Sequence, residues 1–178
     1  MEIPDILVAI LSAEPEGING RTAIQKLGYF VSVELQKKAG YKADFYGPFS
    51  SLVAAHLQAL VGQDFVEEKK RRTIHDRIMY SYSLTEDGEE LAQNVGEEYP
   101  TEYSIIKKVT TKCGKIGHYN FRVLSWAAKV HFVLVQTGRA MTHREAMEAS
   151  RLFNWNLGER QIESGARLLS ALGLIKTR

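Results

Sequence analysis

The segment at residues 67–91, EEKKRRTIHDRIMYSYSLTEDGEEL, carries the pattern that decides the predicted fold. Within nine positions near its start lie five basic residues, Lys69, Lys70, Arg71, Arg72 and Arg77. From position 77 onward, apolar and polar residues alternate, and this period of two is typical of a half-buried strand. A short apolar stretch at 65–66 begins the partner strand. The segment therefore predicts a two-stranded ribbon with a basic loop over residues 69–76.

Three helices are predicted upstream of the ribbon. Residues 3–11 are apolar over a helical length, and a turn that contains proline and glycine follows. Thr22 and Gln25 have the spacing of a capping box, and the apolar stripe behind them extends to about residue 38. Ser50 then caps a third helix, which the glycine at position 62 ends.

A fourth helix is predicted directly after the ribbon, with Thr85 as its N-cap and acidic residues in its first turn. The order helix, helix, helix, ribbon, helix is that of a winged helix-turn-helix domain. In such a domain one helix enters the major groove of DNA and the ribbon, or wing, lies on the backbone. The predicted fold class is therefore mainly α with a small β-ribbon, an N-terminal winged helix-turn-helix followed by a C-terminal helical, helix-turn-helix-like region.

The stretch from the third helix through the ribbon resembles winged-helix regulators that are MarR-like or PadR-like in the broad sense. The matching positions are Leu57, Leu60, Gly62 to Val66, Tyr82, Leu84, Thr85 and Gly88. More narrowly, GINGRTAIQKLGYF at 17–30 and FYGPFSSLVAAHLQAL at 45–60 are similar to the uncharacterised YwgA-like group of prokaryotic proteins and, more distantly, to the Panacea antitoxin domain. The resemblance covers about the first half of the chain. It implies a fold, and a shared fold does not transfer an activity.

The second half is predicted to be helical. Residues 96–120 connect the halves, with a helix over about 102–112, and a strongly apolar run at 121–136 predicts a largely buried helix. Two cap pairs, Thr142 with Glu145 and Asn156 with Glu159, predict two further helices joined by a short turn, and the final ALGLIKTR predicts the start of a strand. We therefore expect a winged helix-turn-helix domain over 1–95, a connecting segment over 96–120 and a helix-turn-helix-like region over 121–178.

The charge of the chain is unevenly distributed. Its net charge is +2, but residues 1–99 carry ten basic and sixteen acidic residues, whereas residues 100–178 carry thirteen basic and five acidic ones. Affinity for nucleic acid comes mainly from phosphate neutralisation by Lys and Arg, and only the ribbon of the first half is locally basic. In the last helix, Arg160, Ser164 and Arg167 share one face, and arginine can bind phosphate or guanine with two parallel hydrogen bonds.

These patterns define the candidate nucleic-acid-binding residues. We expect phosphate contacts from the ribbon, and base contacts from the last helix or, less favourably, from the third: Lys69, Lys70, Arg71, Arg72 and Arg77; Arg160, Gln161, Ser164 and Arg167; Ser51 and Gln58. Other interpretations remain open. The ribbon tip is also compatible with a solvated hairpin, and the arginines of the last helix with salt bridges to the acidic half. The aromatic residues at 41–49 fit either a core or a partner surface.

The sequence pattern argues against several classes of protein, among them membrane proteins, secreted proteins and enzymes with known motifs. No apolar run has the length of a membrane span, and the first residues lack the basic start of a secretory signal, so we expect a cytoplasmic location. Cys113, as the single cysteine, cannot form an intramolecular disulfide. No phosphate-binding glycine motif, HExxH, paired CxxC or nucleophile elbow is present, so we expect no enzyme, cofactor or metal site.

The function expected from the sequence is that of a DNA-binding transcriptional regulator. Half-sites in double-stranded DNA favour two-fold symmetry, so a homodimer is also expected. The alternative is a protein-interaction module, such as an antitoxin or defence-system component, that uses the winged helix as a scaffold and docks a protein partner through the aromatic loop at 41–49.

Overall fold

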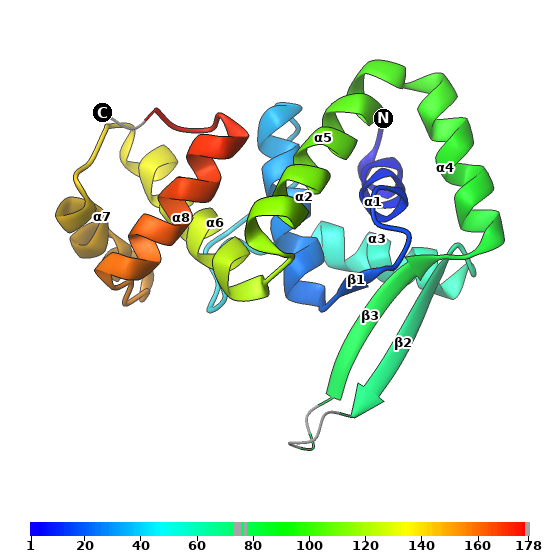
Figure 1. Ribbon diagram of the computed structural model, residues 1–178, viewed down its shortest axis with the longest axis horizontal. Coiled ribbons are helices and arrows are strands. Elements are labelled where there is room, and N and C mark those ends of the chain that lie inside the picture. The colour runs from blue at the N-terminus through cyan, green and yellow to red at the C-terminus, as the bar shows by residue number, and fades with distance from the viewer. Residues whose placement is uncertain (73–75, 77, 177–178) are drawn as a thin grey trace.

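The computed structural model describes residues 1–72, 76 and 78–176. Within that part of the chain it is mainly helical with one small three-stranded antiparallel sheet (Figure 1). In chain order the elements are α1 (Ile3–Ser12), β1 (Ile18–Asn19), α2 (Arg21–Glu34), α3 (Ser51–Gly62), β2 (Val66–Arg72), β3 (Ile78–Leu84), α4 (Glu86–Glu98), α5 (Pro100–Gly117), α6 (Phe121–Thr137), α7 (His143–Ser150), the 3₁₀ helix η1 (Arg151–Phe153) and α8 (Glu159–Leu172). No helix of the described residues has both the length and the apolar character that crossing a bilayer requires.

The predicted ribbon is confirmed as β2 and β3, which pair antiparallel over their whole length from Val66 opposite Leu84 to Arg72 opposite Ile78. The sequence did not predict β1, which pairs with β3 through Ile18 and Tyr82 and completes the strand order β1-β3-β2. The ribbon projects away from the helices at one end of the molecule (Figure 1). The described residues toward its outer end, 69–72 of β2 and 78–79 of β3, are exposed.

Three predicted helix starts are confirmed. The Ser50 hydroxyl accepts a hydrogen bond from the Val53 N–H, and the Thr85 hydroxyl accepts one from the Gly88 N–H. The predicted capping box of Thr142 with Glu145 is present at the start of α7. Each of these caps satisfies a helix N–H that has no partner within the helix.

Several local predictions are wrong. Residues 69–72 lie in strand β2 rather than in the predicted loop, and α2 ends at Glu34 rather than near residue 38. Helix α2 begins after Gly20 without a side-chain cap, because Gln25 bonds instead to the backbone of Ser50. Helix α8 begins at Glu159 after Gly158, not near residue 157 after an Asn156 cap. The described residues 173–176 form no strand.

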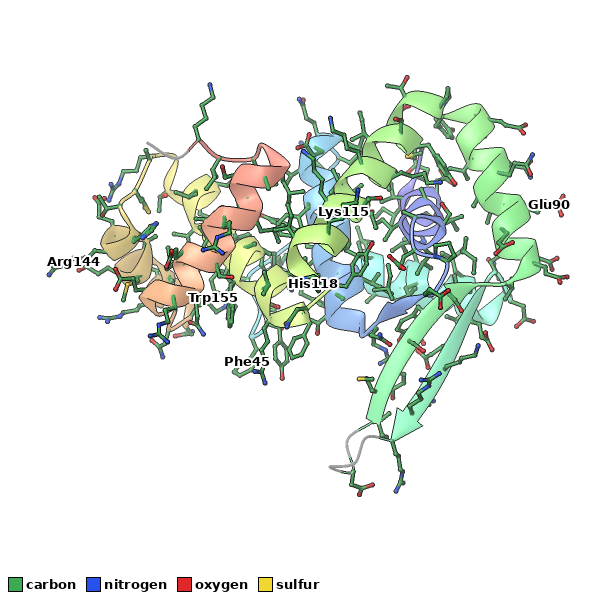
Figure 2. The ribbon with its side chains drawn as sticks, viewed as in Figure 1. Phe45, Glu90, Lys115, His118, Arg144 and Trp155 are labelled. Atoms are coloured by element: carbon green, nitrogen blue, oxygen red, sulfur yellow. The ribbon has the colours of Figure 1, made fainter. Side chains whose placement is uncertain are left out.

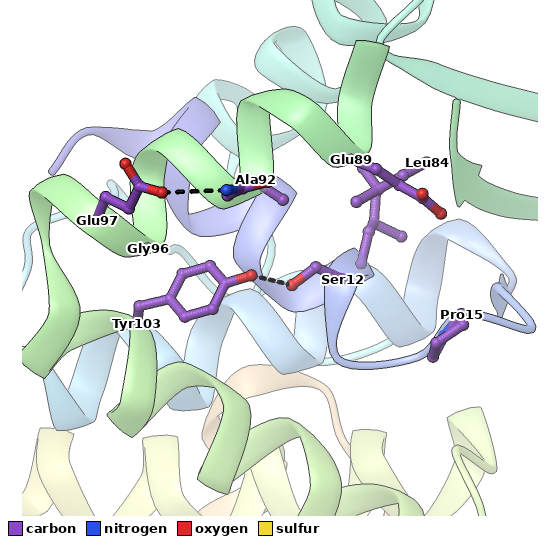
Figure 3. A pocket seen from close by; sticks show the side chains of 10 residues that line it. Ser12, Pro15, Leu84, Glu89, Ala92, Gly96, Glu97 and Tyr103 are labelled. Atoms are coloured by element: carbon purple, nitrogen blue, oxygen red, sulfur yellow. Dashed lines mark hydrogen bonds between the residues drawn. The ribbon is translucent and has the colours of Figure 1, made fainter. Parts of the chain in front are cut away.

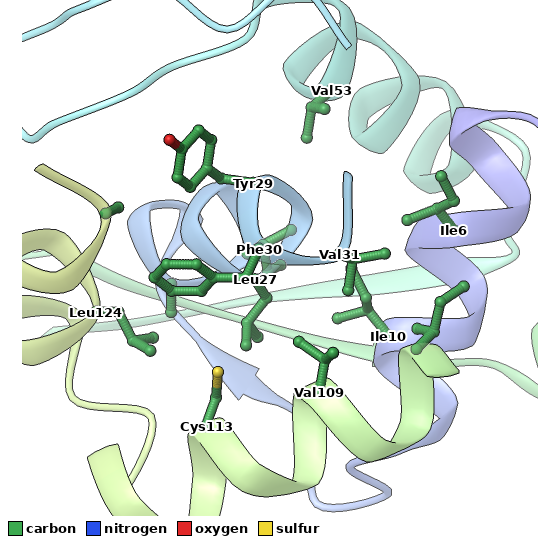
Figure 4. Packing of buried hydrophobic residues seen from close by; sticks show 14 of the residues in the cluster. Ile6, Ile10, Leu27, Tyr29, Phe30, Val31, Val53, Val109, Cys113 and Leu124 are labelled. Carbon is green, nitrogen blue, oxygen red and sulfur yellow. The ribbon is translucent and has the colours of Figure 1, made fainter. Parts of the chain in front are cut away.

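The buried side chains of both halves belong to one cluster centred on α2, where every residue from 23 to 32 is buried. Phe30 of α2, Cys113 of α5 and Leu124 of α6 are fully buried there (Figure 4). Helix α5 packs on α1, α2 and α8, and α6 packs on α2 and α8. The predicted connecting segment is thus mostly a core helix, α5, and α4 continues past residue 95 to Glu98.

Candidate functional site

The ribbon presents the predicted cations to solvent, but its own carboxylates lie beside most of them. Lys69, Lys70, Arg71 and Arg72 are all exposed on β2, and Arg77 lies outside the described residues. Three carboxylates accompany them, with N–O distances of 2.8 Å for Glu67–Lys69, 3.9 Å for Glu68–Lys70 and 3.1 Å for Asp76–Arg72. Such exposed pairs contribute little stability, but they lower the net charge offered to a phosphate.

A further cation that the sequence interpretation missed, Arg21, joins the ribbon from the first position of α2. Its Nε donates to the Tyr82 hydroxyl at 2.7 Å, and its terminal nitrogen lies 3.0 Å from the Glu68 carboxylate. Its guanidinium also lies 4.2 Å from the centre of the Tyr80 ring, which Lys70 approaches to 5.6 Å. Hydrogen bonds from Tyr82 and then Arg21 hold the pKa of the Glu68 carboxyl below its ordinary value.

Helix α3, which would be the base-reading helix, has a neutral outer surface. Its exposed residues are Ser51, Leu52, Ala55, Gln58, Ala59 and Gly62. Ser51 and Gln58 are therefore accessible, as predicted, but no Lys or Arg accompanies them on this helix. Arginine makes the commonest specific contact with guanine, so this surface is poorly suited to direct base readout.

The residues predicted in α8 do not form one surface with the ribbon. Helix α8 packs on α5, α6 and α7, near the end of the long axis away from the ribbon (Figure 1). Arg160 and Arg167 are exposed there, with Arg167 3.7 Å from Glu163, and Ser164 is half-buried. Gln161 has a different role from the predicted base contact, because its side-chain oxygen accepts the Gly158 N–H at 2.9 Å and fixes the helix start.

Three large apolar side chains are exposed on the segment between α2 and α3, and a fourth on the first turn of α3. We define the aromatic patch as Phe45, Tyr46, Phe49 and Leu52, whose exposed fractions are 77%, 53%, 39% and 49%. The rings of Phe45 and Tyr46 meet edge to face with centroids 4.9 Å apart, and Phe45 points away from the helices (Figure 2). Other aromatic side chains near α2 are core, since Tyr29 and Phe30 are buried and Tyr41 is half-buried. Of the aromatic residues that could form a partner surface, only Phe45, Tyr46 and Phe49 are therefore exposed to a partner.

The backbone beneath the aromatic patch is fixed by residues from distant elements. The Lys26 amine donates to the Pro48 carbonyl at 2.7 Å, and the Trp155 indole donates to the Asp44 carbonyl at 2.7 Å across 111 positions. Gln25 bonds both the N–H and the carbonyl of Ser50, at 3.0 and 2.9 Å. The loop that carries Phe45, Tyr46 and Phe49 of the patch is therefore held in place from α2 and from the segment before α8.

One small apolar recess adjoins the aromatic patch. Its volume is about 190 Å³, and its lining includes the buried Ile24, Val53 and Leu57. Phe49 of the patch also lines it, so the recess borders the patch at this residue. This volume is below that of sites that enclose a whole small molecule, and it is suited to one apolar side chain.

Comparisons with known proteins do not assign this surface. No family model matches the sequence, and no curated protein matches it. Among the residues that the structure describes, no three His, Cys, Asp or Glu side chains come together in a way that could hold a metal ion. The features that could carry a function are the aromatic patch, the exposed cations of the ribbon and two cavities.

Proposed function

We propose that the chain is a protein-interaction module on a winged-helix scaffold, which docks an acidic polypeptide segment through the aromatic patch and its recess. The order α1, β1, α2, α3, β2, β3 and the strand order β1-β3-β2 support the winged-helix assignment. One observation carries the functional proposal: large apolar side chains are exposed on a loop whose backbone is fixed by hydrogen bonds from Lys26, Gln25 and Trp155.

Rigidity supports docking because an ordered surface loses little conformational entropy when a partner binds. Aromatic side chains are enriched in the cores of protein interfaces, where a few buried anchors supply most of the binding energy. Exposed apolar side chains that are scattered singly have no such meaning, but here the Phe45 and Tyr46 rings meet edge to face, and Phe49 of the same loop lines an apolar recess. The combination favours a partner that inserts one large apolar side chain.

The charges around the aromatic patch indicate the chemistry of that partner. Lys37, Lys38 and Lys42 are exposed on the segment before it, where Asp44 is the one acidic residue between positions 36 and 49. Arg21 also lines the recess. Because complementary charges steer association and exclude wrong partners, we expect acidic residues to flank the apolar anchor.

The proposal is tested by panning a random dodecapeptide phage library against the wild-type chain. We expect enrichment of peptides with a large apolar residue flanked by Asp or Glu. The double variant Phe45→Ser/Tyr46→Ser should lose this enrichment, because both rings are exposed and their loss leaves the core intact. Leu152→Ser is the matched control, since Leu152 is 78% exposed, like Phe45 at 77%, but lies on η1.

Two outcomes would overturn the interaction proposal. One is the absence of any peptide whose capture depends on Phe45 and Tyr46. The other is a loss of capture in Leu152→Ser that equals the loss in the double variant. If sedimentation instead shows that the wild-type chain self-associates and that the double variant is monomeric, the occupant is a second copy rather than an acidic peptide.

Duplex DNA is a second candidate ligand, and the position of Arg21 favours it. Arg21 and Lys70 contact the same Tyr80 ring, so cations from α2 and from the ribbon meet at one place. Contacts of this kind would bind phosphates rather than read bases, because α3 carries no cation. A regulator of transcription would need base readout from another element.

A gel-shift assay with random duplex separates the two candidates. The ribbon variant Lys69→Gln/Lys70→Gln/Arg71→Gln/Arg72→Gln is compared with Arg144→Gln/Arg151→Gln/Arg160→Gln/Arg167→Gln, which removes four exposed cations from the other end of the molecule. We expect no retardation of the duplex by any of the three proteins at physiological salt. Retardation that only the ribbon variant loses, with a steep dependence on salt, would establish the DNA candidate.

A further inference from the structure

A cavity of about 480 Å³ lies between the end of α1, helix α4 and helix α5 (Figure 3). Its apolar lining comes from Leu11, Leu84 and Ala92, and Pro15 lies at its edge. The volume falls within the range of sites that bind small organic molecules. Neither the ribbon cations nor the aromatic patch contributes to it.

Two hydroxyl groups give the cavity a hydrogen-bonding site. The Ser12 and Tyr103 hydroxyl oxygens are 2.7 Å apart, and the Ser12 hydroxyl donates to the Ala9 carbonyl at 3.1 Å. With the Ser12 proton engaged in this way, Tyr103 donates to Ser12, and each oxygen keeps a lone pair for another donor. The hydroxyl pair is therefore ready to accept a hydrogen bond from a ligand.

The α4 side of the cavity is acidic. Glu89, Gln93 and Glu97 follow each other at four-residue spacing on one face of α4, and all three line the cavity. The lining contains no Lys or Arg, and α4 as a whole has six acidic residues and no basic one. One described cation lies close to the lining residue Tyr103: the Lys107 amine is 5.4 Å from the centre of its ring. A wall of this composition attracts positive charge and repels anions.

We propose that this cavity binds a small amphipathic organic cation. Its apolar part would pack on Leu11, Leu84 and Ala92, and its ammonium group would lie beside the Ser12–Tyr103 hydroxyl pair, facing the acidic side of α4, where the Gln93 amide donates to the Glu97 carboxylate at 3.1 Å. An ammonium group supplies only donors, and the carboxylates and hydroxyls around it supply acceptors. This site is independent of the proposed docking function, because the two surfaces share no residue.

The test uses three probes that share one indole ring: tryptamine, which is a cation at neutral pH, neutral tryptophol and anionic indole-3-acetate. Each is titrated into the isotopically labelled full chain, with amide chemical shifts as the readout. We expect tryptamine to bind at least about tenfold more tightly than tryptophol, and indole-3-acetate to show no binding up to about 10 mM. The shifts should be centred on residues 11–12, 89–97 and 103.

A matched pair of double variants tests the role of the two carboxylates. Glu89→Gln/Glu97→Gln should weaken tryptamine at least about tenfold and leave tryptophol unchanged. Glu86→Gln/Glu90→Gln removes the same charge from exposed positions of α4 outside the cavity lining, and it should change the affinity for tryptamine less than about threefold. Equal affinity for all three probes, no binding of tryptamine, or equal losses in the two variants would each overturn the proposal.

Discussion

The side-chain nitrogen of Lys26 lies 2.7 Å from the carbonyl oxygen of Pro48, and Lys26 is only 1% exposed. This bond joins the central helix α2 to the loop that carries the aromatic patch. Its acceptor is a neutral backbone carbonyl, so burial of the protonated amine is not offset by a carboxylate at hydrogen-bond distance. The loop is therefore tied to the core through a group whose charge depends on pH.

Replacement of Lys26 is expected to change the pH dependence of stability. Desolvation lowers the pKa of Lys26 from 10.5 to about 7. Between these values the unfolded chain binds the proton and the folded chain does not, so the free energy of unfolding rises with pH, by up to about 1.4 kcal/mol per pH unit. Below about pH 7 both states are protonated and this contribution is constant. In Lys26→Met, the contribution of this residue to the rise of the free energy of unfolding with pH should be absent.

Urea unfolding at several pH values between about 7 and 9 measures this effect. The stability of Lys26→Met relative to the wild type should fall steadily as the pH rises across this window. Lys42→Met is the control, because it removes an exposed lysine from the same loop. Parallel pH profiles for the wild type and Lys26→Met would contradict the assignment.

Removal of the Trp155 indole N–H is expected to loosen the loop. Trp155→Phe keeps a ring near Phe132 and Phe153 but deletes the hydrogen bond to the Asp44 carbonyl. We expect a loss of about 1–2 kcal/mol in the free energy of unfolding and faster amide exchange at residues 45–47. Trp126→Phe replaces the other tryptophan and should leave exchange in the loop unchanged. Equal exchange rates in the two variants would contradict the role given to Trp155.

Local chemistry explains which helix boundaries were predictable. Ser50, Thr85 and Thr142 each cap an N–H three residues away, so the sequence contains both partners within one turn. Gln25 has the same spacing from Thr22, but the structure uses it to bind Ser50, which is 25 positions away. No local rule distinguishes these two uses. Strand β1 has two residues, which is too short for a period to be visible.

The close approach of α6 and α8 is expected to depend on Gly165. A Cβ atom at this position would lie 3.0 Å from the Ala127 nitrogen and 3.0 Å from the Trp126 carbonyl carbon, so backbone would have to move. We expect Gly165→Ala to lower the free energy of unfolding by about 1–3 kcal/mol. Gly62→Ala is the control, because it is also helical and has no atom within 4 Å of the added Cβ. That variant should be neutral or slightly more stable in the same urea experiment.

The candidate site was predictable in part. The ion pairs of β2 were visible in the sequence, because a period of two places Glu67 beside Lys69 and Glu68 beside Lys70. The contacts of Arg21 with Tyr82 and Glu68 of the ribbon were not visible in the sequence, because they depend on β1 and on the packing of α2. The exposure of Phe45 and Tyr46 was equally hidden, because residues 41–49 have no period from which an inner and an outer face can be assigned.

The central claim is that Phe45 and Tyr46 form the anchor site for a partner segment. Fluorescence anisotropy of one acidic peptide selected by panning, titrated with the wild type, Phe45→Ser and Leu152→Ser, tests it most directly. We predict that Phe45→Ser weakens binding at least about tenfold and that Leu152→Ser changes it less than about twofold. Dissociation constants that are equal for the two variants would contradict the account.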